Sequence, residues 1–90
     1  MRTIELDGRK MDSRVKAHSY IKHVLALPEH YGANLDALTD CLGELNDVTI
    51  ILTHGGAMLN ALGEYGARLL EVLRAAGEGR TGYLFRESRG

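Results

Sequence analysis

Apolar and polar residues alternate or recur at fixed intervals along the chain, and these intervals predict its secondary structure. Residues 3–6 alternate and precede the pair Asp7-Gly8, which is typical of a short strand that ends in a turn. Residues 48–52 are nearly all apolar and β-branched, which predicts a central parallel strand covered on both faces. Residues 82–85 predict a third strand, and the polar residues 86–90 predict a tail that frays.

Between the predicted strands, apolar residues recur every three or four positions, as they do along one face of a helix. The first helix is predicted from about residue 13 to residue 26, and the second from the N-cap Asn34 to about Leu45. A short helix over residues 58–62 and a longer one over residues 68–76 follow. Helical segments between strands favour parallel pairing with right-handed crossovers. We therefore expect an α/β fold in which about four helices pack on a three-stranded parallel sheet.

Length and composition limit the class of protein. Ninety residues are enough for one domain, which we place over residues 1–90, and too few for a deep internal active site. No apolar run approaches the ~20 residues of a membrane helix, and residues 1–7 lack the apolar stretch of a signal peptide. The single cysteine, Cys41, cannot form an internal disulfide. These features predict a cytoplasmic protein without a membrane partner.

The net charge of the chain is only −1, but the charged residues are distributed unevenly along it. All eleven Lys and Arg residues lie within residues 1–22 or 68–90. The intervening stretch carries six carboxylates, on Glu29, Asp36, Asp40, Glu44, Asp47 and Glu64. An acidic face attracts basic partners and disfavours direct binding of nucleic acid, which needs a cationic surface. The simpler alternative is that these acids only form a solvated surface.

Asp36, Asp40 and Glu44 follow one another at intervals of four residues, so they line one side of the predicted second helix. That side lies opposite the leucine stripe and faces solvent. Like charges at this spacing cost the helix about 0.2–0.5 kcal/mol per pair, which suggests a functional role, although surface helices often tolerate such pairs. The preceding loop adds His30 and Tyr31 as candidate recognition residues, and Tyr31 could equally pack on the domain.

Catalytic and metal-binding chemistry has little support in the sequence. Cys41 has no basic neighbour in the chain to lower the pKa of its thiol, which favours a structural role. The four histidines, at positions 18, 23, 30 and 54, show no metal-ligand spacing, so we predict no metal and no cofactor. A convex helix face does not form a cleft. We therefore predict a binding protein without a small-molecule substrate; a small hydrolase using Asp36, Asp40 and His30 is one alternative.

Residues 25–42 resemble the signature segment of the barstar family, with the pattern L-P-x-x-Y-G-x-N-L-D-A-L-x-D-C-L. Weaker similarity extends in both directions, for example at Ala17-His18 and Gly66-Ala67. The resemblance implies a bacterial cytoplasmic inhibitor of a secreted, barnase-like ribonuclease, built on a three-stranded parallel sheet. It also implies that the second helix and the loop before it enter the substrate cleft of the enzyme in a 1:1 complex.

Position by position, the resemblance assigns Asp40 to the phosphate site of the nuclease and Asp36 to a second acidic contact. Together with Glu44, which continues the acidic row, these carboxylates would mimic the phosphates of RNA. The resemblance places the remaining contacts on the loop and the adjoining helix face, at His30, Tyr31, Gly32, Ala33, Asn34 and Thr39.

Three positions depart from the family pattern. His30 replaces a tyrosine, Thr39 replaces a tryptophan, and Ala75 replaces a glutamate that also contacts the enzyme. We expect these changes to weaken binding to barnase itself while the phosphate-mimicking part is kept. The alternative function is an immunity or regulatory protein of the same fold, whose acidic face binds a different basic toxin or protein.

Overall fold

Residues 2–88 are described in the computed structural model of the protein, and they form a parallel sheet with four α-helices. The strands are ordered β1-β2-β3, so β2 is central. In chain order the elements are β1 (Arg2–Asp7), the short 3-10 helix η1 (Gly8–Lys10), α1 (Arg14–Leu25), α2 (Leu35–Glu44), β2 (Val48–Thr53), α3 (Gly55–Leu62), α4 (Glu64–Ala75) and β3 (Tyr83–Ser88). The expected α/β fold and strand order are confirmed.

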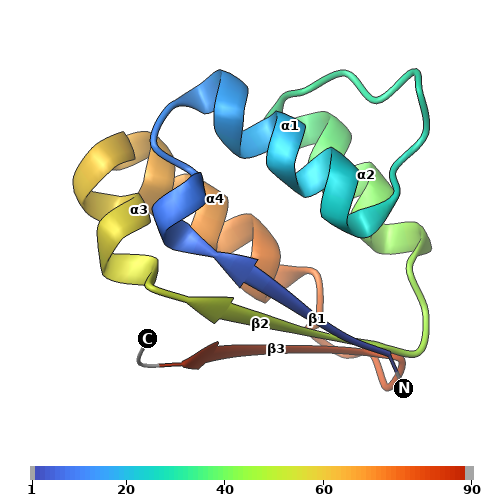
Figure 1. The fold of residues 1–90 in the computed structure, drawn as a ribbon. Helices are drawn as coiled ribbons and strands as arrows, with labels where there is room; N and C mark the ends of the chain where they lie inside the picture. The colour runs from blue at the N-terminus through green and yellow to red at the C-terminus, as the bar shows by residue number, and fades with distance from the viewer. Residues whose placement is uncertain (1, 89–90) are drawn as a thin grey trace.

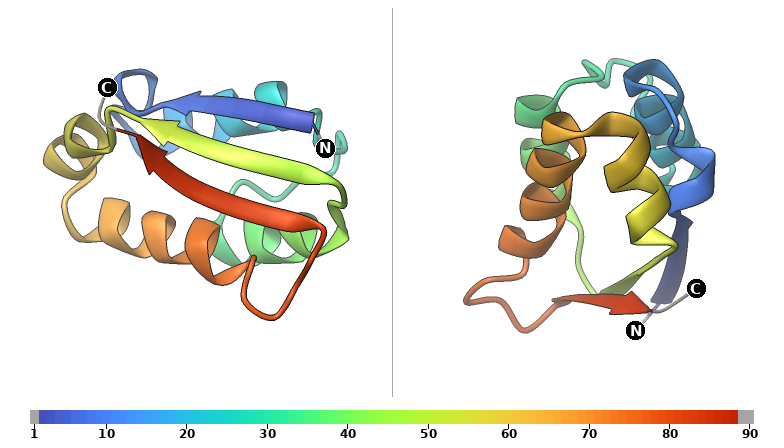
Figure 2. Two further views of the ribbon diagram at one scale, coloured as in Figure 1. Left: turned by 90° about the horizontal axis from the view of Figure 1, so that it is seen from below. Right: turned by 90° about the vertical axis from the view of Figure 1, so that its left-hand side faces the viewer.

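The four helices all lie on one side of the sheet (Figures 1 and 2). Side chains of β2 therefore alternate between fully buried and partly exposed, with Val48, Ile50 and Leu52 at 0% exposure. The expectation that β2 is covered on both faces is wrong. Both crossovers run in the same direction across the sheet, and two right-handed crossovers of that kind place their helices on the same face. Within residues 2–88 no helix covers the opposite face (Figure 2).

Strand β3 is longer than its apolar residues indicate. We expected a frayed tail from residue 86, but Arg86, Glu87 and Ser88 continue the strand and pair with residues 51–53 of β2. Backbone hydrogen bonds to a central strand hold this segment, and they do not depend on the polarity of its side chains. Residues 89–90 of the expected tail lie outside the described residues.

Helices α3 and α4 both begin earlier than their apolar spacing predicts, at Gly55 and at Glu64. A single residue, Gly63, turns the chain between them with φ +59°, a conformation that glycine adopts without strain. Gly66 lies inside α4, where an added Cβ would stand 3.2 Å from the carbonyl oxygen of Met58. Glycine at this position therefore lets α3 and α4 pack closely. No helix within residues 2–88 is long and apolar enough to cross a membrane.

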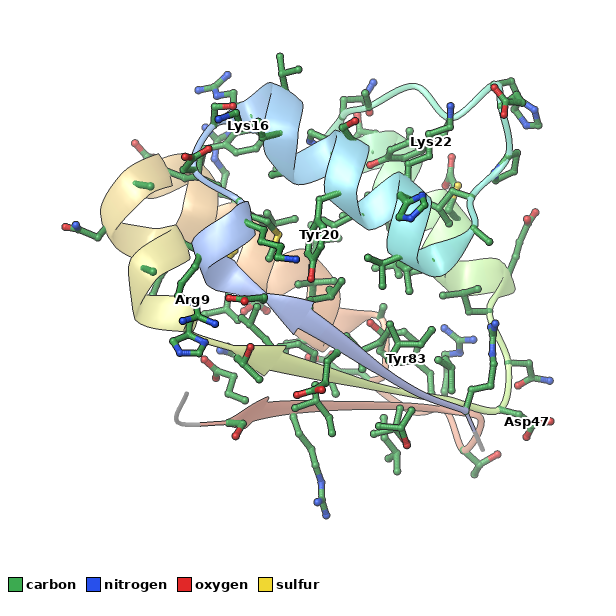
Figure 3. All side chains as sticks on the ribbon, viewed as in Figure 1. Arg9, Lys16, Tyr20, Lys22, Asp47 and Tyr83 are labelled. Carbon is green, nitrogen blue, oxygen red and sulfur yellow. The ribbon has the colours of Figure 1, made fainter. Side chains whose placement is uncertain are left out.

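The core lies between the sheet and the helices. Tyr83 is fully buried there, and its hydroxyl donates a hydrogen bond to the carbonyl of Leu73, 2.8 Å away (Figure 3). Tyr20 reaches from α1 to β1, where its hydroxyl accepts a hydrogen bond from the backbone N–H of Asp7. Other fully buried side chains come from every layer: Leu6, Met11, Ile21, Leu38, Leu42, Ile50, Leu52, Met58 and Leu69.

Candidate protein-binding site

Helix α2 presents the acidic row in a fixed orientation. Its leucine stripe buries Leu38 and Leu42 completely, and this burial determines which side of the helix faces out. At its start, the side chain of Asn34 accepts a hydrogen bond from the backbone N–H of Ala37 at 2.8 Å. This is an N-cap, which satisfies one of the unpaired N–H groups of the first turn.

Asp36, Asp40 and Glu44 are all exposed on the outer side of α2, as their spacing predicts. None of the ion pairs formed within residues 2–88 involves these three carboxylates. Asp36 lies in the first turn, where the helix dipole favours an anion. Glu44 is the last residue of the helix, where the dipole disfavours an anion and no basic residue occupies the turn. The row is therefore a charged surface without internal neutralisation.

Arg80 supplies the missing cation at the end of α2. Its guanidinium donates hydrogen bonds to the carbonyl of Leu42 at 3.0 Å, to the carbonyl of Leu45, and to the carbonyl of Ala76 at 2.9 Å. These carbonyls lie at the ends of α2 and α4, where the last carbonyls of a helix lack a partner in a following turn. Arg80 was not identified from the sequence, because it lies 35 or more residues from the carbonyls of Leu42 and Leu45 and belongs to no motif.

The loop before α2 is anchored by a buried histidine. Nδ1 of His18 lies 2.6 Å from the hydroxyl of Tyr31, and Nε2 lies 2.6 Å from the hydroxyl of Tyr65 on α4. Burial lowers the pKa of His18, because it disfavours the charged imidazolium, and it raises the pKa of Tyr31. A neutral imidazole has one donor and one acceptor nitrogen, so it pairs with both hydroxyls at once. Tyr65 was not identified from the sequence.

The remaining loop residues differ in how much they present to a partner. Tyr31 is only 9% exposed, which favours a packing role for most of its ring. His30, Gly32 and Ala33 are exposed, and Ala33 has a left-handed backbone with φ 54°. Thr39 on α2 is also exposed, and its hydroxyl donates to the carbonyl of Leu35.

A groove of about 950 Å³ runs beside the N-terminal half of α2, between α1 and α4. We call it the α1–α4 groove. Five of the candidate contact residues line it, namely Tyr31, Ala33, Asn34, Asp36 and Thr39. The α2 side of the groove carries one carboxylate, Asp36. The side formed by α1 and α4 carries Arg14, Lys22 and Arg68 together with Glu71, so positive charge is in excess there. The segregation of charge along the sequence did not predict that acidic and basic side chains line the same groove.

The surface near α2 also includes the thiol of Cys41, which is not a reactive group. Cys41 is half-buried, and desolvation together with Glu44 and Asp40 raises the pKa of its thiol. Such a thiol stays protonated at neutral pH.

Among residues 2–88 no three His, Cys, Asp or Glu side chains gather where they could hold a metal ion. Ala75 is exposed at the end of α4, which packs against α2.

The chain is similar to known proteins in two comparisons. The family model described as "Barstar (barnase inhibitor)" matches residues 1–86. Among curated proteins, the chain is 39% identical over 80 residues to "Putative ribonuclease inhibitor YrdF" of Bacillus subtilis (strain 168). The match covers 87% of this chain and 88% of that relative.

Proposed function

The chain belongs to the barstar family, and from this premise we propose that it blocks the active site of a barnase-like extracellular ribonuclease with α2 and the loop before it. The family and the relative together indicate a ribonuclease inhibitor rather than an enzyme. The partner, the inserted surface and the substrate mimicry are our proposal, and we place the complex at one inhibitor per enzyme. We further propose the bacterial cytoplasm as the location, because there an inhibitor protects the cell that makes the enzyme.

The observation that carries the proposal is the row of exposed carboxylates on α2. Residues four apart on a helix are separated by about 6 Å along its axis, so Asp36, Asp40 and Glu44 offer anionic oxygens at regular intervals. A ribonuclease active site holds Arg, Lys and His side chains ready for a phosphodiester. Carboxylates presented to such a site form charge-assisted hydrogen bonds in place of the phosphates. Inhibition of this kind needs no chemical step.

Rigidity supports the same proposal, because a surface that is already ordered loses little entropy when it docks. Three separate contacts order this surface: the Asn34 cap at the start of α2, the Arg80 bonds at its end, and the His18 bridge under the loop. In addition, the unneutralised charge of the row accelerates encounter with a basic enzyme.

The three departures from the family pattern direct the proposal to a nuclease other than barnase. His30, Thr39 and Ala75 are all exposed, so each replacement changes the surface and leaves the core intact. The proposed contacts Asp36 and Asp40 are kept. We therefore propose a barnase-like enzyme whose periphery complements smaller side chains than those of the family pattern.

Titration calorimetry against a panel of barnase-like secreted ribonucleases, with RNA cleavage measured in parallel, tests this function. Asp40→Asn removes one charge from the row, and Glu5→Gln removes one from the sheet face opposite the helices. We expect tight 1:1 binding that blocks cleavage, is strongly weakened by Asp40→Asn, and is unchanged by Glu5→Gln. Folded protein that binds none of the enzymes would overturn the proposal and point to a different basic protein as the partner.

A further inference from the structure

The α1–α4 groove adjoins the proposed interface, so a partner that covers the N-terminal half of α2 must also cover the groove. Asp36 and Thr39, which stand on α2, are lining residues of the groove as well as proposed contacts. The lining includes Val15, an apolar residue that is 81% exposed and available for contact. A groove of about 950 Å³ is large enough to receive side chains of a docked protein.

Two cations in the groove have no carboxylate partner. Neither Arg14 nor Arg68 forms an ion pair within residues 2–88. Of the other charged groups of the lining, Lys22 lies 3.6 Å from a carboxylate oxygen of Glu29, and Glu71 is paired with Arg74 at 2.9 Å. Asp36, on the α2 side, has no ion pair within residues 2–88. The far wall of the groove is therefore positive where it meets a partner.

These two guanidinium groups are held in place by a single ring. Arg14 lies 4.3 Å and Arg68 lies 6.0 Å from the ring centroid of Tyr65, within the range of cation–π contact. The Tyr65 hydroxyl is itself fixed by His18. The cations are thus positioned by the same hydrogen-bonded bridge that anchors the loop before α2.

We propose, resting on the function proposed above, that the ribonuclease fills this groove with an acidic segment that borders its cationic active site. A carboxylate of that segment pairs with Arg14 and Arg68 while the active-site cations meet Asp36 and Asp40. An enzyme that is cationic over this whole area would instead bring like charges against Arg14 and Arg68, which costs binding free energy. The groove therefore selects among basic nucleases, and Arg14 and Arg68 are specificity-determining residues.

The double variant Arg14→Gln, Arg68→Gln tests the proposal in calorimetry with a nuclease that the unmodified protein binds. Its matched control is Arg2→Gln, Arg86→Gln, which removes two exposed arginines of the sheet. We expect the groove variant to bind about tenfold more weakly than the control at low ionic strength, with the difference shrinking as salt is added. The conservative Arg14→Lys, Arg68→Lys variant keeps the charge and should recover part of the loss.

The sign of the effect separates the proposal from its alternative. If the groove faces a cationic surface, removing its two positive charges tightens binding, and a groove variant that binds as well as or better than the control overturns the inference. In that case a normal loss on Asp40→Asn leaves the inhibitor function standing. If the unmodified, folded protein binds no nuclease of the panel, the function and this inference both fall.

Discussion

The hydroxyl of Tyr31 lies 2.6 Å from Nδ1 of His18, and this contact joins the loop before α2 to α1 in the protein interior. His18 is 2% exposed, and its second nitrogen continues the connection to Tyr65 on α4. Three segments that surround the proposed interface are thereby held by one side chain. The shape of the contact loop thus depends on a side chain that is itself almost entirely buried.

Replacing His18 with alanine should strongly destabilise the protein. The change leaves the buried hydroxyl of Tyr31 and the half-buried hydroxyl of Tyr65 without this partner and opens a cavity, so we expect a loss of about 2–4 kcal/mol in the free energy of unfolding. Urea denaturation measures this loss. His23→Ala is the matched control, because His23 lies on the same helix but is exposed, and its replacement should cost about 0.5 kcal/mol or less. Equal effects of the two substitutions would contradict the bridging role of His18.

The same residue predicts a loss of stability in mild acid. Burial lowers the pKa of His18 below its ordinary value of 6.5, so near that pH the unfolded chain takes up a proton that the folded chain does not. By linkage, the free energy of unfolding is highest above pH 6.5 and decreases as pH falls toward the folded-state pKa. Urea titrations at pH 7 and pH 5 measure the difference. His18→Gln should flatten the dependence in this window, and an unchanged slope would exclude His18 as its source.

Asp7 contributes in a separate, more acidic window, which keeps the two effects apart. Hydrogen bonds from Arg9 lower the pKa of Asp7 to about 2, against an ordinary value of 3.8. The resulting stabilisation is present above pH 3.8 and is lost as pH falls from there toward 2. Because this carboxylate stands near the surface, solvent screening keeps its contribution small.

Arg80 should stabilise the fold and also maintain the orientation of α2. Arg80→Gln removes charge-assisted hydrogen bonds to the C-terminal carbonyls of α2, for which we expect a loss of about 1.5–3 kcal/mol in the free energy of unfolding. Arg80→Lys keeps the charge but reaches fewer carbonyls, so its free energy of unfolding should lie between that of Arg80→Gln and that of the unmodified protein. The exposed Arg86→Gln serves as control. For a nuclease that the unmodified protein binds, Arg80→Gln should raise the dissociation rate of the complex. An unchanged dissociation rate would show that Arg80 acts on stability alone.

Local features of the sequence predicted well those parts of the site that depend on neighbouring residues. The four-residue spacing of Asp36, Asp40 and Glu44 correctly predicted an exposed row, because helix geometry and the leucine stripe are both local. Asn34 was likewise recognisable as an N-cap from its place before the apolar stripe.

Contacts between distant segments were not predictable in this way. Tyr65 is 47 residues from His18, and Arg80 is 35 residues from Leu45, so only the packing of α4 and β3 brings them together. The same holds for the basic wall of the groove. For β2, a run of β-branched residues is compatible with burial on one face or on two, and the direction of both crossovers determines which one occurs.

Restoring the family residues at the three departed positions should increase affinity for barnase itself. Because His30, Thr39 and Ala75 are exposed, the combined variant His30→Tyr, Thr39→Trp, Ala75→Glu should fold normally. We expect its affinity for barnase to exceed that of the unmodified protein by about tenfold or more, from added aromatic contact and one further carboxylate. Calorimetry measures this gain, with Ala61→Glu on the exposed side of α3 as a control for added charge. An unchanged affinity would place the contact surface elsewhere.

The acidic row should trade stability of the free protein for binding. Glu44 ends α2, where the helix dipole disfavours an anion, and it stands four residues from Asp40. Glu44→Gln removes both unfavourable terms, and because Arg80 already places a cation at this end of α2, it should stabilise the free protein by only about 0.2–0.5 kcal/mol. Asp36→Asn removes one like-charge pair but also an anion that the first turn favours, so it should give no comparable gain.

Thermal and urea denaturation measure the stability of the two variants. Their association rates are measured with a nuclease that the unmodified protein binds. Each variant should associate more slowly, with a weaker dependence on salt, because each removes one charge that attracts a basic enzyme. The result that identifies the row as a binding surface is a Glu44→Gln variant that is more stable yet slower to bind. If Glu44→Gln gains stability and associates at the original rate, Glu44 belongs to the solvated surface, and the contact ends at Asp40.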